Sequence, residues 1–300
     1  MAGIPFNKEL TFKYGVVDQV SPLIRRVICN NPGPFTLHGT GTYIVGQGKV
    51  CVIDPGPLND DHVAALMQAV EGEEVTHIVC THTHMDHSPA AAPLKAATGA
   101  PTYGFGPHGS GRPEFSGEES QEGADNDFLP DHEIRDGDKI EGDGWTLQAV
   151  YTPGHTSNHT CFTLLEENVL FSGDHIMGWS TTIVSPPDGD MGRYMASLDK
   201  LIAMDHVRYW PTHGDTIPDP QNYVRAYKEH RLDRDRQILE QLSKGSQKIP
   251  AMVKVMYADV PDYLHPAAAR SVLSHLIQLV ETGQARCDSE PGPDGVYSKV

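Results

Sequence analysis

The stretch that decides most about this chain is residues 81–87, which read THTHMDH. It directly follows an apolar run that is typical of a buried strand. If the chain is still extended there, alternate side chains point the same way, so His82 and His84 face one direction. Asp86 and His87 then lie at the following turn and can reach a second position nearby. Because imidazole and carboxylate groups bind zinc and similar ions, this loop predicts the start of two adjacent metal sites.

Further metal-binding side chains follow along the chain, each at the end of an apolar run. A tight turn after one run carries His155, the next run ends at Asp174, and a third leads to His213. Each signal is weak alone, since the chain holds 16 histidines. The ordered set of the HxHxDH loop followed by His, Asp and His is much stronger, and it supplies the additional donors that a dinuclear centre needs.

In this ordered motif the sequence resembles the metallo-β-lactamase superfamily over roughly residues 10–220. Carried over residue by residue, the resemblance implies two groups of metal ligands and one carboxylate that bridges them. The first group is His82, His84 and His155, the second is Asp86, His87 and His213, and the bridge is Asp174.

Other residues are expected to support this centre from outside. Asp54, in the run VIDPG, resembles the superfamily's first motif, a carboxylate that buttresses the metal ligands. His159, in the run GHTSNH, is expected to support the ligands in the same way, and this stretch is similar to the glyoxalase II and β-lactamase-like protein 2 groups. Trp179 and Tyr194 lie in segments that can reach the mouth of the site, so both are candidate substrate contacts.

A centre of this kind favours hydrolysis. Two cations about 3.5 Å apart can hold a water or hydroxide between them, lower its pKa and polarise a substrate oxygen. The resemblance therefore implies a dizinc hydrolase that cleaves a thioester, lactone or phosphoester of a small molecule. Iron and manganese also suit imidazole and carboxylate ligands. Asp86 and Asp174 offset part of the cations' charge and are the candidate catalytic residues.

Alternative functions stay open at this point. The resemblance to β-lactamase-like protein 2 implies a single-strand endoribonuclease, and other relatives are iron-dependent persulfide dioxygenases that use only the first group of ligands. Flavo-diiron proteins have Glu where this chain has His84, and β-lactamases of this fold typically lack the residue that corresponds to Asp174. A non-catalytic binding module is expected to lose ligands, and none is lost in this sequence.

Strand-like and helix-like patterns alternate through the first two thirds of the chain. Residues 42–45 and 49–53 flank a glycine-rich turn, which predicts a hairpin. The pattern alone indicates a mixed α/β fold; the resemblance implies a four-layer αβ/βα sandwich with the metals at one edge of two facing sheets. Later patterns are helical and resemble a small winged-helix-like unit. We therefore expect a catalytic domain over residues 1–220 and a C-terminal domain over residues 221–300.

Residues 104–144 are rich in Gly, Asp, Glu, Pro and Ser and poor in apolar residues. This composition predicts a long loop, which is either a flap near the site mouth or a solvated excursion. His108 and His132 lie in it and are expected at the surface.

The formal net charge of −17 is unevenly divided. Residues 1–220 hold 12 Lys and Arg against 30 Asp and Glu, giving −18, whereas residues 221–300 hold 11 against 10, giving +1. An acidic catalytic part disfavours RNA and favours a small-molecule substrate. A cluster of basic side chains recurs at helical spacing, but interleaved acids predict a salt-bridged, solvated face. The cluster consists of Arg225, Lys228, His230, Arg231, Arg234 and Arg236.

The sequence shows no membrane or secretory segment. No apolar run reaches the roughly 20 residues that cross a bilayer, and residues 1–13 lack the pattern of a signal peptide. Five scattered cysteines without a CxxC pair predict reduced thiols, mostly buried. These features favour a cytoplasmic protein without a membrane partner, and a homodimer is compatible with them.

Overall fold

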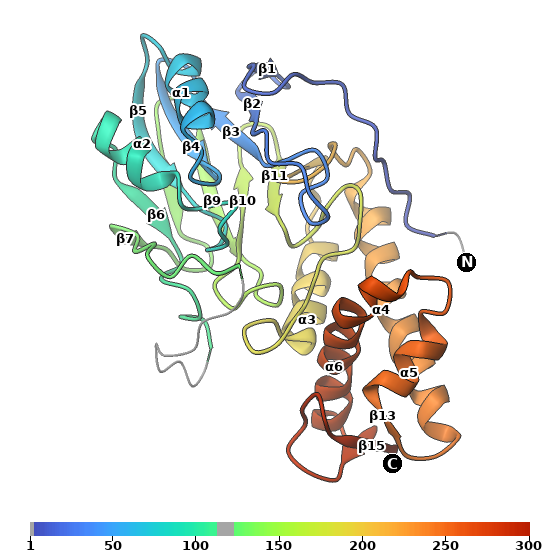
Figure 1. The fold of residues 1–300 in the computed structure, drawn as a ribbon. Coiled ribbons are helices and arrows are strands. Elements are labelled where there is room, and N and C mark those ends of the chain that lie inside the picture. Colours follow the sequence, from blue (N-terminus) through green and yellow to red (C-terminus); the bar gives the residue numbers. More distant parts are fainter. Residues whose placement is uncertain (1–2, 113–122) are drawn as a thin grey trace.

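The computed structural model describes residues 3–112 and 123–300. Two β-sheets lie face to face, and helices cover their outer faces (Figure 1). The predicted four-layer αβ/βα sandwich is therefore confirmed, as is a smaller helical part that follows it along the chain.

The first sheet has seven strands in sequence order, and its pairing changes from antiparallel to parallel halfway along. The parallel pairs β4–β5 and β5–β6 are connected through helices, as parallel neighbours usually are, whereas β3 and β4 form an antiparallel hairpin. The strands are β1 (Asp18–Gln19), β2 (Ile24–Ile28), β3 (Gly41–Val45), β4 (Lys49–Ile53), β5 (Glu74–Val79), β6 (Thr102–Gly104) and β7 (His132–Glu133).

The second sheet has five strands in the order β12-β11-β10-β9-β8. Only the pair of β11 and β12 is parallel, because a helix separates these two strands in the sequence. The strands are β8 (Lys139–Glu141), β9 (Thr146–Tyr151), β10 (Thr160–Leu164), β11 (Val169–Gly173) and β12 (Arg208–Pro211).

The apolar side chains that alternate along these strands build three cores. One core lies between the sheets and contains Tyr43, Phe162 and Phe171. A second lies between the first sheet and helices α1 (Asp60–Ala69) and α2 (Ala91–Thr98). A third lies between the second sheet and helices α3 (Met191–Ile202) and α4 (Pro220–Ser243). Strands buried on both faces explain the continuous apolar runs in the sequence.

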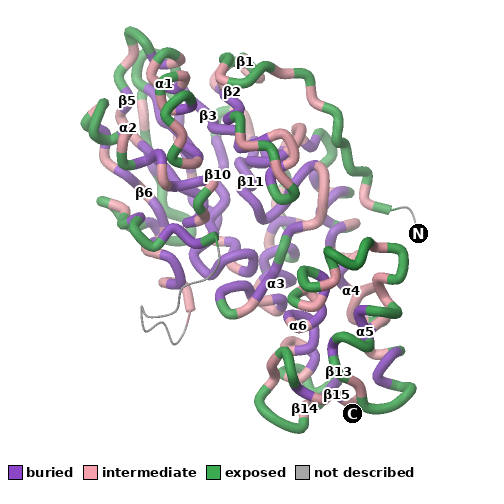
Figure 2. Tube along the Cα trace, in the orientation of Figure 1, coloured by how far each residue is buried: buried purple, intermediate pink, exposed green. Residues whose placement is uncertain are grey.

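The C-terminal part is built around the far half of α4. Its elements are β13 (Gln247–Lys248), α5 (Ile249–Met256), the short 3-10 helix η1 (Asp262–Leu264), α6 (His265–Glu281), β14 (Ala285–Cys287) and β15 (Val296–Lys299). The three strands form a small sheet in the order β13-β15-β14. Buried residues of α5 and α6 share one apolar core with buried residues of α4, and Figure 2 marks the buried positions along the chain.

Helix α4 is shared by both parts of the molecule. Tyr223, Val224 and Tyr227 in its first half pack against the second sheet, whereas Ile238 and Leu242 join the C-terminal core. The predicted boundary between residues 220 and 221 stays a prediction.

The structure corrects the predicted loop over residues 104–144. The described part of this segment contains β7 and β8, which extend the edges of the two sheets. Residues 113–122 lie outside the described residues, and the flap prediction falls partly on them.

No described helix combines the length and the apolar composition needed to cross a membrane. All five cysteines are free thiols, and four of them are buried, as predicted.

Candidate metal centre

The predicted ligands meet at one edge of the sandwich, because every one of them follows the end of a strand. The loop after β5 carries the HxHxDH residues, and His155 follows β9. Asp174 directly follows β11, and His213 follows β12. Both sheets thus contribute to one cluster, which neither sheet could build alone.

Three imidazoles form the first group. Nδ1 of His84 lies 3.0 Å from Nε2 of His82 and 3.1 Å from Nε2 of His155. A tetrahedral metal with bonds of about 2.0 to 2.1 Å places its nitrogen ligands about 3.3 Å apart. The three nitrogens therefore have nearly the spacing that one such ion requires.

The second group lies beside the first. Nε2 of His213 is 3.1 Å from Oδ2 of Asp86, and Nε2 of His87 is 3.6 Å from the same oxygen. Oδ1 of Asp174 lies 3.5 Å from both of these imidazole nitrogens. Its other oxygen, Oδ2, lies 3.8 Å from Nε2 of His155 in the first group. Asp174 thus stands between the two groups, where the sequence predicted a bridging carboxylate.

Distant backbone carbonyls and one carboxylate fix which nitrogen of each imidazole faces the cluster. Nδ1 of His155 donates to the carbonyl of Ile183 at 2.6 Å, and Nδ1 of His213 donates to the carbonyl of Gly39 at 3.1 Å. Nδ1 of His87 donates to Oδ2 of Asp54 at 2.9 Å. In each ring the proton points outward, so the Nε2 lone pair points inward in the neutral tautomer.

The tautomer of His82 follows from a chain of hydrogen bonds. The Thr81 hydroxyl donates its only proton to Asp54 at 2.8 Å, so it must accept from Nδ1 of His82, 3.0 Å away. This leaves the lone pair of His82 Nε2 facing the first group.

A cation fits this arrangement better than hydrogen bonds do. A proton on His84 Nδ1 can serve one of the two facing lone pairs and leaves the other without a partner. The inward nitrogens of His87 and His213 and Oδ1 of Asp174 are buried and have no hydrogen-bond partner. Buried polar atoms are normally satisfied, and a metal ion at each group satisfies all of them.

The surroundings shift the pKa values of the histidines in the two ligand groups in opposite directions. Burial, together with the charge of the neighbouring imidazoles, lowers the pKa of His82 and His84 well below the ordinary value. Burial also disfavours the charged form of His87, but the carboxylates of Asp86, Asp174 and Asp54 outweigh it and raise the pKa of that imidazole. The first group is therefore the more ready to offer neutral lone pairs, which metal binding requires.

Asp54 is the anchor beneath the second group. Its carboxylate accepts from the Thr81 amide at 2.7 Å, the Thr81 hydroxyl at 2.8 Å, the Thr212 hydroxyl at 2.9 Å and His87 Nδ1 at 2.9 Å. These donors come from the loops after β5 and β12, so one buried side chain ties both loops together. This is the position that the sequence predicted for a supporting carboxylate.

His159 lies directly behind Asp174. Its Nε2 accepts from the Asp174 amide at 3.2 Å, so its Nδ1 carries the proton and donates to the Thr152 hydroxyl at 3.0 Å. Both ring nitrogens are thereby occupied, which leaves His159 to support Asp174 from outside.

The two candidate substrate contacts differ in their surroundings. Trp179 is partly exposed and packs against Gly214, next to His213. Tyr194 is completely buried, and its hydroxyl donates to the carbonyl of His175 at 2.8 Å. The structure therefore gives no support to a substrate contact of Tyr194. The helical pattern of the sequence placed Tyr194 on α3, but it could not show that its side chain packs inward.

His108 was missed as a neighbour of the site, and its predicted surface position is wrong. It is buried, with Nδ1 3.0 Å from the Thr83 hydroxyl and Nε2 3.7 Å from Oδ2 of Asp188. Its ring centre lies 6.1 Å from that of His84. No local signal could reveal this, since the surrounding sequence is polar and the contacts come from far along the chain. His132 is exposed, as predicted.

The cluster opens to solvent at His84 and Asp86, the two predicted ligands that are partly exposed. The side chain of Asp86 is 27% exposed, compared with 10% for Asp174 and 0% for His87 and His213. An attacking water and a substrate must therefore approach from the side where His84 and Asp86 lie.

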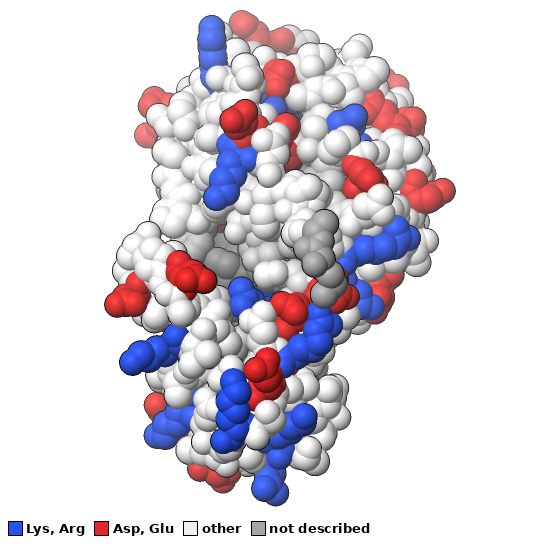
Figure 3. Space-filling view, turned by 90° about the vertical axis from the view of Figure 1, so that its right-hand side faces the viewer, with Lys and Arg blue, Asp and Glu red and all other residues white. Residues whose placement is uncertain are grey.

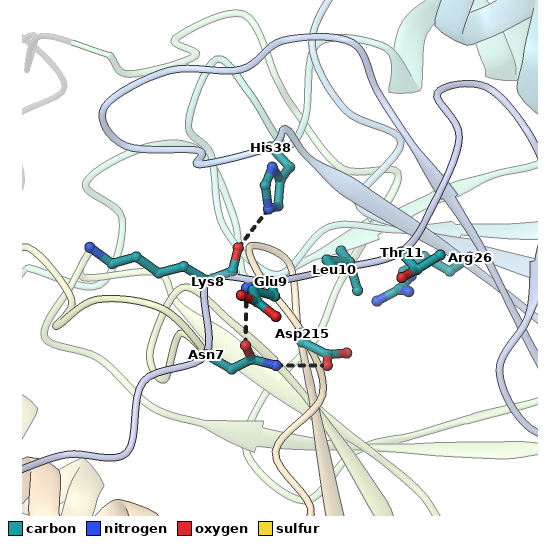
Figure 4. A pocket seen from close by; sticks show the side chains of 8 residues that line it. All are labelled: Asn7, Lys8, Glu9, Leu10, Thr11, Arg26, His38 and Asp215. Atoms are coloured by element: carbon teal, nitrogen blue, oxygen red, sulfur yellow. Dashed lines mark hydrogen bonds between the residues drawn. The ribbon is translucent and has the colours of Figure 1, made fainter.

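A separate open pocket of about 730 Å³ lies near this edge (Figure 4). The N-terminal segment forms one wall, where Asn7 pairs with Asp215 at 3.2 Å and the Lys8 carbonyl accepts from His38 at 2.9 Å. None of the seven predicted metal ligands lines this pocket.

Comparison with known families gives two matches along the chain. Residues 36–213 match the model of the metallo-beta-lactamase superfamily, and residues 249–292 match the beta-lactamase associated winged helix domain. The winged-helix-like character of the C-terminal part, predicted from the sequence, is thereby confirmed.

Individual proteins give the same result. The chain is 33% identical to a beta-lactamase-like protein 2 homolog of Caenorhabditis elegans, over 89% of this chain and 87% of that protein. It is 29% identical to an atrochrysone carboxyl ACP thioesterase of Aspergillus chevalieri, over 85% of this chain and 77% of that protein. A beta-lactamase domain protein from Burkholderia ambifaria has the same fold, with a TM-score of 0.81, 19% identity and coverage of 99% of this chain and 97% of that one.

Proposed function

Because the chain belongs to the metallo-β-lactamase superfamily, we propose that it is a metal-dependent hydrolase that cleaves a thioester of a small molecule. The observation that carries this proposal is the pair of ligand groups that share Asp174. Two zinc ions are the metals we propose, held by His82, His84 and His155 on one side and by Asp86, His87 and His213 on the other. When bound, such ions supply Lewis acidity toward a substrate oxygen and toward the attacking water.

The protein's own groups orient the reactants. Asp86 is the more exposed of the two carboxylates, and His87 and His213, against the effect of burial, hold its pKa below the usual range. It can therefore accept a hydrogen bond from the attacking water and fix the direction of attack. Asp174 is more deeply buried and separates the two ligand groups, so its part is to keep them in register.

Of the three bond types predicted from the sequence, we propose the thioester as the substrate bond, and we keep lactones and phosphoesters as alternatives. A relative that covers most of this chain is named as a thioesterase, which supports this choice.

The charge distribution supports a small-molecule substrate over RNA. Acidic side chains interleave with the basic ones over the face drawn in Figure 3. On α4, Arg236 pairs with Glu229 at 2.8 Å and with Asp233 at 3.1 Å, as the predicted salt-bridged face requires. Neutralised basic groups of this kind release few counterions on contact with a polyanion.

The test combines metal analysis with a substrate panel. Purified protein is analysed for zinc, iron and manganese, and is then assayed with an acyl thioester, an aliphatic lactone, an aryl phosphodiester and single-stranded RNA. We expect about two zinc ions per chain and turnover of the thioester. In His84→Ala and Asp174→Ala we expect metal loss and a fall in kcat/KM of more than about 100-fold.

Exposed residues of the same types serve as controls. His132→Ala and Asp143→Ala should keep both metal content and activity, because both side chains are exposed. A protein that binds no metal would end the proposal, and cleavage of RNA alone would replace it with the ribonuclease alternative. A single bound iron would favour the dioxygenase alternative.

A further inference from the structure

Arg231 is a buried charge for which the proposed function has no role. It was predicted on a solvated face of α4, but the structure leaves it only 3% exposed. Within the described residues it forms no ion pair, its Nε has no hydrogen-bond partner, and its guanidinium carbon lies 5.2 Å from the centre of the Tyr194 ring. Burying an unpaired charge is costly, so its contacts need an explanation.

Within the described residues the guanidinium donates to one main-chain carbonyl, and that contact leads toward the metal centre. One terminal nitrogen of Arg231 donates to the backbone carbonyl of Thr182. The hydroxyl of Thr182 lies 2.7 Å from the carbonyl of Asp174 and 3.0 Å from that of His175, and can donate to either. Arg231 thus fixes Thr182, and Thr182 in turn can hydrogen-bond to the main chain of Asp174.

The next residue along the chain reaches the first ligand group. The carbonyl of Ile183 accepts from Nδ1 of His155 at 2.6 Å, which sets the tautomer and the direction of that imidazole. The carbonyls of Thr182 and Ile183 belong to adjacent peptide groups, so holding the first limits how far the second can move. One buried guanidinium therefore acts on both Asp174 and His155.

We propose that Arg231 is a positioning residue of the metal centre, which fixes Asp174 and His155 through Thr182 and Ile183. The inference rests on the proposed function, since it requires that these two residues bind metal. It also assigns a role to α4, the helix shared with the C-terminal part: that helix supports the centre from behind.

Two simpler roles of Arg231 predict different results. If the arginine only stabilises packing, its loss lowers the melting temperature and leaves metal affinity unchanged. If it acts only as a charge, its loss relieves repulsion of the metal cations and tightens metal binding. Of the three roles, only the positioning role predicts that metal binding becomes weaker when Arg231 is replaced by an uncharged residue.

The experiment measures zinc affinity of the full chain by competition with a chromophoric chelator. We expect Arg231→Met to weaken zinc binding about tenfold, within the range found for residues that support metal ligands. Arg234→Met is the matched control, because Arg234 lies on the same helix and also stacks on a tyrosine, Tyr257, at 4.6 Å. Among the described residues Arg234 makes no hydrogen bond to Thr182 or Ile183, so we expect a change of less than about twofold.

Thr182 gives a second route that leaves the charge in place. Thr182→Val removes the hydroxyl at nearly constant volume and should weaken zinc binding about tenfold, whereas Thr182→Ser should restore it. The double variant with Arg231→Met should lose about tenfold rather than about 100-fold, because the two residues act in series. Melting temperatures of the metal-free variants show that each one folds.

Zinc affinity unchanged or tightened in Arg231→Met, with a normal Thr182→Val, would overturn the inference. Fully additive losses of zinc affinity in the double variant of Arg231→Met and Thr182→Val would also overturn it. If the parent protein binds metal but hydrolyses no substrate, the proposed function fails while zinc affinity still decides the role of Arg231. If the parent binds no metal, both fail.

Discussion

At the scale of single residues, Asp54 shows how one buried side chain can determine a site that it does not enter. It follows β4 in the left-handed backbone region, with φ of 49°, and its carboxylate gathers four hydrogen bonds from two loops. Asn tolerates this backbone region, so Asp54→Asn changes the hydrogen bonding and leaves the local fold in place.

We expect Asp54→Asn to weaken the second ligand group more than the first, because Asp54 touches His87 directly but reaches His82 only through Thr81. The amide cannot accept from all four donors, so His87 loses its fixed orientation and metal affinity falls about 10- to 100-fold at that group. Metal analysis after limited dialysis should then find about one ion per chain. Asp143→Asn, at an exposed position, should behave like the parent. Equal loss of both ions would show that Asp54 supports the whole cluster.

His62 makes the stability of the fold depend on pH. This residue of α1 is buried beside the Thr42 hydroxyl, 2.9 Å away, and burial lowers its pKa to about 4. The unfolded chain has a pKa near 6.5 for histidine and so binds a proton more readily. The contribution is therefore fully present above pH 6.5 and is lost as the pH falls toward 4.

The expected loss from His62 is about 2 kcal/mol between pH 8 and pH 5. His62→Gln cannot titrate, and its free energy of unfolding should fall less over that range. Urea unfolding of both proteins at the two pH values measures the difference, and the remaining histidines cancel in the comparison. A difference in stability between the two proteins that is the same at pH 5 and pH 8 would contradict this prediction.

At the scale of elements, the turn between β9 and His155 depends on close packing against α3. Gly154 has φ of 142°, and a Cβ there would lie 2.4 Å from Cα and 2.6 Å from N of Tyr194. The Gly154 carbonyl also accepts from the amide of Asp190, the residue that caps α3. The position of His155 is thus determined by how closely a helix approaches a turn.

We expect Gly154→Ala to destabilise the protein by about 3 kcal/mol or more and to lower its metal content, because the turn must move away from α3. Gly72→Ala is the matched control, since Gly72 has φ of 80° but nothing within 4 Å of an added Cβ. That variant should lose only about 1 kcal/mol. Urea unfolding measures the loss of stability, and metal analysis measures the loss of metal. Equal losses of stability in the two variants would contradict the claim that close packing against α3 requires glycine at position 154.

At the scale of the whole molecule, the ligand cluster joins the two halves of the sandwich. The first sheet supplies the HxHxDH loop, and the second supplies His155, Asp174 and His213. A bound ion therefore cross-links elements that otherwise meet through the core between the sheets, and it stabilises only the folded state.

Chelation should accordingly lower the melting temperature by at least about 5 °C, as expected for ligands that saturate the native state and do not bind the unfolded chain. Adding zinc back should reverse the shift. His84→Ala should melt near the temperature of the chelated parent and should respond little to chelator. A parent protein whose melting temperature is unaffected by chelator and by zinc would argue against a cross-linking role.

The sequence by itself determined the identity and order of the clustered side chains, the hairpin formed by β3 and β4, and the helical character of the C-terminal part. These features are local: a ligand side chain is recognisable by its type and spacing, and an element by its periodicity and its caps.

Only the tertiary structure decided which nitrogen of each histidine faces the centre, why Asp54 matters, and that His108, Tyr194 and Arg231 are buried. Each of these depends on partners far along the chain, such as Gly39 for His213 and Thr182 for Arg231. A polar residue in a polar stretch looks solvated until a distant segment supplies its hydrogen bonds. Burial and tautomer are properties of the assembled contacts, so no local pattern encodes them.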